Sequence, residues 1–290
     1  MSAVLASAAR GTGVALEARD LAHRYGRRIG LEPVSFTLEA PGVLAITGAN
    51  GSGKSTLLRI LAGLLRATAG TVSLTVEGRA IAAAERRRWV GYAAPELSFY
   101  DELSVEENLV FVAQARGLIG PAAAATAALT RVGLDGRARD RVPALSSGMK
   151  QRLRIAFALL HRPPLLLLDE PGSHLDDEGR ATLAGLVEQE RRAGLVLMAT
   201  NDEREWRLAE QRIELRGRGV LPVECIQEQA RRSGIARGDR PLFQRKRGTI
   251  LNRREQIVTE LQAHDVPSLL DGRLRPRGRG GDPTRWTRVR

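Results

Sequence analysis

Short apolar runs alternate with segments of helical periodicity along the first 220 residues of the chain. Brief runs such as VLAIT and LLLL are typical of buried strands, and apolar residues recurring at helical spacing indicate helices with one buried face. The pattern predicts strands over residues 43–47, 71–76, 165–168, 194–200 and 211–215, and helices over residues 54–65, 104–116, 121–132, 148–160 and 177–192. Strands that alternate with helices favour an α/β fold with a mainly parallel central sheet.

One stretch departs from this alternation, because helix follows helix without a strand between residues 100 and 160. Its first helix carries a capping box, in which Ser104 can cap the helix and Glu107 can reach back to it. We therefore expect a helical insertion, at about residues 97–160, on the sheet of one main domain. The chain divides into an N-terminal extension, this domain and a C-terminal extension, at residues 1–14, 15–220 and 221–290.

The C-terminal extension is set apart by its charge. The 290 residues carry a net charge of +12, and residues 221–290 hold 16 Lys and Arg against 8 Asp and Glu. Hydrophobic periodicity fades there, and we expect disorder from about residue 272. Such a segment could lie against anionic lipid, bind nucleic acid, or be a solvated extension without function. We favour the last, because Phe243 and Trp286 are too few aromatic side chains for a base-stacking platform.

Composition excludes several classes of protein. Hydrophobic residues make up 43% of the chain and charged residues 27%, which rules out a wholly disordered or collagen-like protein. No apolar run approaches the roughly 20 residues that cross a bilayer, and the N-terminus lacks the pattern of a secretory signal. A single cysteine, Cys225, cannot form an internal disulfide, so we expect a cytosolic protein.

A glycine-rich segment, GANGSGKS at residues 48–55, stands between the first predicted strand and the first predicted helix. It satisfies the phosphate-loop (P-loop) pattern G-x-x-x-x-G-K-[ST] in the required context. Its glycines let backbone N–H groups turn toward phosphate oxygens, and the helix adds the positive end of its dipole. We expect Lys54 to contact the β- and γ-phosphates and Ser55 to offer its hydroxyl to Mg²⁺. The predicted ATP-binding residues of this segment are Gly48, Ala49, Asn50, Gly51, Ser52, Gly53, Lys54, Ser55 and Thr56.

Two carboxylates follow the apolar strand at residues 165–168. Ligands of open α/β sheets sit at the carboxyl ends of the strands, so Asp169 belongs beside the P-loop, where it can hold Mg²⁺ or its water. The side chain of Glu170, one residue further along the chain, points in a different direction from that of Asp169 and can accept a proton from an attacking water. The pair therefore predicts a metal ligand and a catalytic base.

The segment LSSGMKQR at residues 145–152 precedes that strand by about one helix. It resembles the signature of the ATP-binding-cassette (ABC) ATPases, LSGGQ followed by Arg or Lys and Gln-Arg. Leu145, Ser146 and Gly148 match, and the other two positions are mild variants. The resemblance implies a P-loop NTPase fold with N-terminal antiparallel β strands and a helical (signature) subdomain. It also implies a second ABC ATPase domain, in a homodimer or heterodimer, whose ATP Ser146 and Gly148 would contact.

Other elements of this family align over residues 15–216, with two departures. Tyr25 falls where an aromatic side chain stacks on adenine, and residues 173–176 resemble the loop that touches the partner domain. Pro95 or Glu96 stands in place of a glutamine that helps to hold Mg²⁺. Because carboxylates suit a hard cation, Glu96 is a candidate ligand. Asn201 stands in place of a histidine that contacts the γ-phosphate. Asparagine can donate a hydrogen bond but cannot become cationic. We therefore expect Asn201 only to orient groups at the γ-phosphate, while Glu170 takes the proton from the attacking water.

The resemblance implies an ATPase subunit, with ATP and Mg²⁺, that drives a separate membrane-spanning subunit from the cytoplasmic face of the membrane. Residues 96–109 resemble transporter-type members, and among these the exporter-type subunits, including the haem-exporter group of cytochrome c assembly. One alternative is a soluble ABC ATPase acting on ribosomes or nucleic acid, which only the basic extension favours. Another is an ATP-binding switch with weak hydrolysis, which Asn201 motivates. The sequence does not specify the cargo or the direction of transport.

Overall fold

The computed structural model describes residues 13–215. Predictions for residues 1–12 and 216–290, including the charged C-terminal extension and Cys225, lie outside the described residues. In the part of the chain that is described, no helix is both long enough and apolar enough to span a bilayer.

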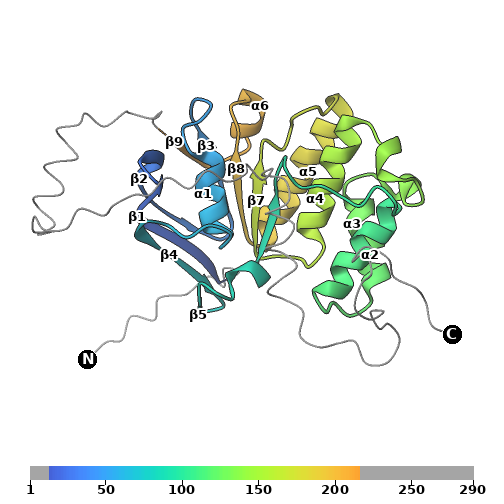
Figure 1. Cartoon of the computed structure of the whole chain (residues 1–290), viewed down its shortest axis with the longest axis horizontal. Helices are drawn as coiled ribbons and strands as arrows, with labels where there is room; N and C mark the ends of the chain where they lie inside the picture. The colour runs from blue at the N-terminus through green and yellow to red at the C-terminus, as the bar shows by residue number, and fades with distance from the viewer. Residues whose placement is uncertain (1–12, 216–290) are drawn as a thin grey trace, which may run out of the picture. The chain divides into compact units, whose positions relative to one another are not determined.

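Strands near the N-terminus form an antiparallel sheet in the order β2-β1-β4-β5 (Figure 1). They are β1 (Val14–Tyr25), β2 (Arg28–Glu39), β4 (Ala69–Val76) and β5 (Arg79–Ile81). In β1 the alternate side chains of Val14, Leu16 and Ala18 are buried, as expected where one face of a sheet covers a core. The antiparallel strands that the resemblance implied are therefore present, and the strand expected at residues 71–76 is β4.

A second, wholly parallel sheet has the order β6-β7-β8-β3-β9. Its strands are β3 (Gly42–Thr47), β6 (Val90–Ala93), β7 (Leu165–Asp169), β8 (Leu195–Ala199) and β9 (Gln211–Glu214). Because all strands run the same way, their carboxyl ends meet at one edge, where Asp169 and Ile46 both pair in register with Ala199. That edge therefore gathers the residues that follow β3, β7 and β8.

Each central strand of the parallel sheet contributes to two cores. Leu165 and Leu167 pack on the side of helix α1 (Lys54–Leu61) and the antiparallel sheet, whereas Leu166 and Leu168 pack on the opposite side. That opposite side is covered by α4 (Ser147–Leu159) and α5 (Asp177–Ala193), as Figure 1 shows. Burial on both faces explains why these strands read as continuous apolar runs.

The helical insertion consists of α2 (Val105–Ala115), α3 (Pro121–Arg131) and α4, joined by the short 3₁₀ turns η2 (Asp135–Arg137) and η3 (Val142–Ala144). The capping box at Ser104 and Glu107 is formed as predicted. Helix α1 ends at Leu61 rather than at residue 65, because Gly63 adopts φ +73° and the chain turns there. Two further short elements, η1 (Arg86–Arg88) and α6 (Glu203–Trp206), precede β6 and β9. The predicted fold class is confirmed.

Candidate active site

The P-loop connects β3 to α1 and is closely packed against the chain beneath it. Gly48 adopts φ +143°, and a Cβ atom there would lie 2.5 Å from the carbonyl oxygen of Leu215 and 2.7 Å from the Ser52 hydroxyl. Gly53 adopts φ +106°, and its Cβ would lie 2.5 Å from the carbonyl oxygen of Gly30. Backbone conformation and space therefore both require glycine at these two positions.

The P-loop contains polar groups that have no hydrogen-bond partner among the described side chains. Gly53 caps α1 without any side-chain hydrogen bond, so the first N–H groups of the helix have no side-chain acceptor at that position. The Ser52 hydroxyl is buried and has no hydrogen-bond partner. Uncapped amides at the positive end of a helix favour an anion, so the loop suits a phosphate group.

Lys54 brings its charge to the same place. Its side chain is only 7% exposed, and its ammonium group donates a 2.7 Å hydrogen bond to the Gly48 carbonyl oxygen. The ammonium also lies 3.9 Å from a carboxylate oxygen of Glu170. A buried ammonium held over the loop provides a fixed positive charge for phosphate oxygens.

Asp169, at the end of β7, is 2% exposed and bonded to side chains on two neighbouring elements. Ser55 of α1 forms a hydrogen bond with its carboxylate, and the Tyr92 hydroxyl on β6 donates one to Oδ2 at 3.4 Å. Burial raises the pKa of Asp169, and these two hydrogen bonds partly oppose the rise. Ser55 and Asp169 therefore place two oxygen donors side by side, and their role as magnesium ligands stays a prediction.

Glu170 has an unusual backbone conformation, with φ +51° in the left-handed region. Its N–H donates to the Ala199 carbonyl oxygen at 2.8 Å. Burial raises the pKa of its carboxyl group, the positive charge of Lys54 lowers it in part, and Asp169 raises it further. The result is a partly buried carboxylate, more basic than an exposed one, next to the P-loop.

Glu96 lies just beyond β6 and is half exposed. Its carboxylate forms an ion pair with Arg59 of α1, and its negative charge contributes to the raised pKa of Asp169. Glu96 is therefore near the candidate magnesium ligands but already has a cationic partner. Its role as a ligand stays a prediction.

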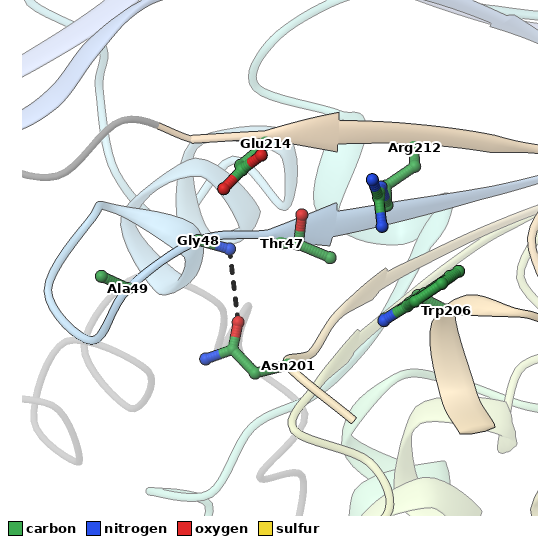
Figure 2. Close-up of a pocket in the computed structure, with 7 residues that line it drawn as sticks. All are labelled: Thr47, Gly48, Ala49, Asn201, Trp206, Arg212 and Glu214. Carbon is green, nitrogen blue, oxygen red and sulfur yellow. Dashed lines mark hydrogen bonds between the residues drawn. The ribbon is translucent and has the colours of Figure 1, made fainter. Parts of the chain in front are cut away.

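Asn201 follows β8 and reaches across to the start of the P-loop. The Gly48 N–H donates to the Asn201 side-chain oxygen at 3.3 Å, the contact drawn as a dashed line in Figure 2. The two residues line a pocket of about 440 Å³, into which Trp206 and Arg212 also project. The Arg212 guanidinium lies 4.7 Å from the centre of the Trp206 ring, a cation–π contact. The side-chain oxygen of Asn201 is thus engaged by the loop, and its amide nitrogen is the group left to face a ligand.

Tyr25 ends β1 close to the start of α1. Its ring is 45% exposed and contacts the His23 ring edge-on, and a Cβ atom on Gly30 would lie 2.6 Å from it. Its hydroxyl is 3.5 Å from the Thr56 hydroxyl. The Tyr25 ring is thus exposed beside the P-loop, and its contact with adenine stays a prediction.

Ser146 and Gly148 do not lie with the P-loop residues; they begin α4, on the face of the sheet opposite α1. Ser146 caps the helix by accepting a hydrogen bond from the Met149 N–H at 3.2 Å. A Cβ on Gly148 would lie 2.7 Å from the His174 carbonyl oxygen, so this glycine permits close packing. A role for these two residues toward the nucleotide of a second domain stays a prediction.

Comparison with known proteins identifies the family. The family model described as ABC transporter matches residues 31–173. The cytochrome c biogenesis ATP-binding export protein CcmA of Brucella abortus (strain 2308) is 40% identical over 187 residues, which make up 64% of this chain and 85% of that protein. The chain belongs to the ABC transporter ATP-binding family. The resemblance predicted from the signature segment is confirmed.

Two further ABC proteins are similar to this chain over part or most of their length. The linearmycin resistance ATP-binding protein LnrL of Bacillus subtilis (strain 168) is 33% identical over 190 residues, and the match covers 64% of this chain but 60% of LnrL. The chain thus spans less than two thirds of the length of that relative. A solved structure of the ATP-binding subunit of an ABC transporter is 28% identical with a TM-score of 0.60, covering 76% of this chain and 95% of that one.

Sequence reasoning missed several side chains of this ABC site. Tyr92 was given no role and its strand β6 was not predicted, although an aromatic hydroxyl at a carboxyl end of the sheet was a usable signal. Arg59, which pairs with Glu96, gave no signal because its partner lies on a distant segment. Gln151 was considered only as part of the signature segment, yet it is 2% exposed and bonds to the loop that carries Glu170.

Proposed function

We propose that this chain is the ATP-binding and ATP-hydrolysing subunit of an ABC membrane transporter. The observation that carries the proposal is the meeting of Lys54, Asp169 and Glu170 at one edge of the parallel sheet, with the Lys54 ammonium 3.9 Å from the Glu170 carboxylate. This arrangement supports binding of a triphosphate at the P-loop and attack by water on it. Relatives named as ATP-binding and ATP-binding export proteins support the same function.

In the proposed reaction, water attacks the γ-phosphorus of ATP, the bond to the bridging oxygen breaks, and ADP and phosphate are released. Glu170 accepts the proton that the water loses, and its raised pKa makes it a better base than an exposed carboxylate. Lys54 and the α1 amides offset negative charge on the phosphates. Asn201 orients the start of the loop through Gly48.

The oxygen donors at the site fit Mg²⁺. Ser55 and Asp169 would hold the ion, with Glu96 as a further candidate. Residues 13–215 contain no cluster of three His, Cys, Asp or Glu side chains that could hold a metal alone. Mg²⁺ commonly binds through one or two carboxylates together with substrate phosphates, so this donor set suits it. When bound, the ion would supply positive charge against the phosphate oxygens.

A second ABC ATPase domain is part of the proposal. Ser146 and Gly148 stand at the start of α4 and away from their own P-loop, which supports a role toward the nucleotide of a partner domain. The partner is either a second copy of this chain or a related chain. We do not expect nucleic acid as a partner.

A membrane-spanning subunit is the other proposed partner, which places the chain at the cytoplasmic face of the membrane. Tyr100 and Phe111 contact each other edge-on and are 42% and 47% exposed, and the Ile119 side chain nearby in the chain is fully exposed. Large apolar side chains grouped on a surface favour contact with another protein. We propose that this surface binds the membrane subunit.

Purification of the full chain from detergent-solubilised membranes tests this partner. We expect a multi-span membrane protein to co-purify in stoichiometric amount, and Phe111→Asp to abolish its recovery while ATP hydrolysis by the isolated chain is unchanged. Recovery with ribosomes or nucleic acid instead, together with no effect of Phe111→Asp, would contradict the transporter assignment and favour the soluble alternative.

A further inference from the structure

A buried polar junction connects α4 with the loop that carries Glu170. Its centre is Gln151, whose side chain is 2% exposed. The Gln151 side-chain amide donates hydrogen bonds to the carbonyl oxygens of Glu170 and Pro171, each at 3.2 Å. Both carbonyls belong to the turn that immediately follows β7. A buried amide with two such acceptors holds that turn in place.

Arg154 fixes which way the Gln151 amide faces. The Arg154 guanidinium donates to the Gln151 side-chain oxygen at 3.2 Å. Because a guanidinium has only donors, the oxygen of the amide must face it and the nitrogen must face the two carbonyls. Arg154 itself is anchored by donating to the Leu97 carbonyl oxygen at 3.1 Å. The orientation of Gln151 is therefore determined from both sides.

The turn that Gln151 holds is the one that most needs support. Glu170 has φ +51°, a conformation that non-glycine residues adopt at a cost and retain only when their surroundings enforce it. Its N–H is bonded to the Ala199 carbonyl oxygen on β8, and its carbonyl oxygen is bonded to Gln151 on α4. The peptide of Glu170 is thus fixed on both sides, which sets the direction of its carboxylate toward Lys54.

We propose that Gln151 is a positioning residue for the reaction, which holds the Glu170 backbone so that its carboxylate faces the attacking water. This inference rests on the proposed ATPase function, in which Glu170 is the base. Gln151 does not touch the nucleotide in this account; it acts only through Glu170. Loss of its two hydrogen bonds should therefore lower turnover without weakening ATP binding.

The test compares Gln151→Met, which keeps the length of the side chain but removes its amide, with Gln114→Met, the same change at an exposed position of α2. The full chain is assayed for kcat and for ATP affinity by calorimetry. We expect Gln151→Met to lower kcat by about tenfold or more, with ATP affinity within about twofold of wild type. Gln114→Met should match wild type in both.

A second comparison separates positioning from a general structural role. In a Glu170→Gln background the base is already absent, so adding Gln151→Met should cause no further loss of turnover. A further loss equal to that seen in the wild-type background would overturn the proposal, as would wild-type kcat in Gln151→Met. A wild-type chain that does not hydrolyse ATP would instead refute the proposed function itself.

Should Gln151→Met fail to fold, Gln151→Glu gives the same comparison. A carboxylate retains the shape of the side chain and its contact with Arg154, but offers no N–H to the two carbonyl oxygens. We expect a similar fall in kcat with ATP affinity preserved. A folded Gln151→Glu chain with wild-type turnover would overturn the proposal.

Discussion

Replacement of Asn201 by alanine tests how the loop after β8 acts on the P-loop. In the structure the Asn201 side-chain oxygen accepts one hydrogen bond, from the Gly48 N–H at 3.3 Å, and the contact borders a pocket of about 440 Å³. A single hydrogen bond between uncharged groups contributes about 0.5–1.5 kcal/mol net. If that energy orients the loop for the reaction, its loss corresponds to a fall in turnover of about twofold to tenfold.

The assay is steady-state ATP hydrolysis combined with calorimetric ATP binding on the full chain. We expect Asn201→Ala to lower kcat in that range and to change ATP affinity little, because the Lys54 and α1 contacts remain. Asn201→Asp is the informative partner variant, since it keeps an oxygen for the Gly48 N–H but adds a negative charge beside the phosphates. It should weaken ATP binding as well. Turnover of Asn201→Ala equal to wild type would refute this reasoning.

Three further outcomes are expected. Glu96→Ala should raise the Mg²⁺ concentration that gives half-maximal hydrolysis; an unchanged magnesium dependence would show that Glu96 is not a ligand. Tyr92→Phe, which removes the hydroxyl that donates to Asp169 Oδ2, should raise the same concentration by about twofold to tenfold, and a magnesium titration identical to wild type would contradict that role. Burial of the His161 ring, together with the smaller effect of the positive charge of Arg116, lowers the pKa of His161 to about 3. Below about pH 6.5, His161 is therefore protonated in the unfolded chain but stays neutral in the folded chain. The free energy of unfolding should therefore fall with decreasing pH by up to about 1.4 kcal/mol per pH unit from this group, and denaturant titrations of His161→Phe should show a smaller slope between pH 6.5 and 4; equal slopes would contradict it.

The central strands and the P-loop could be predicted because their physical requirements are local. A strand buried on both faces must be apolar throughout, which made residues 165–168 recognisable, and the acids at its end followed directly. The glycines of the P-loop are required by positive φ values and by close backbone contacts at Gly48 and Gly53. Such local constraints restrict the residue types at these positions, so they can be recognised in the sequence.

The hydrophobic alternation that predicts a strand is weaker in β1 and β2. In β1 the alternation of buried and exposed side chains is interrupted, because Asp20 adopts φ +46° and the register with β2 shifts between Ala18 and Leu21. A bulge of this kind places polar residues where a regular strand would have apolar ones. The family resemblance, rather than periodicity, indicated these antiparallel strands.

Side chains that meet across the site could not be placed from sequence. Tyr92 reaches Asp169 only because β6 pairs with β7, and that order of strands depends on the whole sheet. Gln151 reaches the Glu170 carbonyl because α4 packs along β7. Contacts of this kind depend on tertiary packing, so sequence motifs alone do not predict them.

The most direct test of the account is ATP hydrolysis by the full chain in which Glu170 is replaced by glutamine. The substitution keeps the shape of the side chain but removes its ability to accept a proton. The account predicts ATP affinity close to wild type and turnover lower by about a hundredfold or more, whereas Lys54→Ala should lose affinity as well. Turnover of Glu170→Gln at the wild-type rate would contradict the assignment of Glu170 as the base and, with it, the proposed reaction.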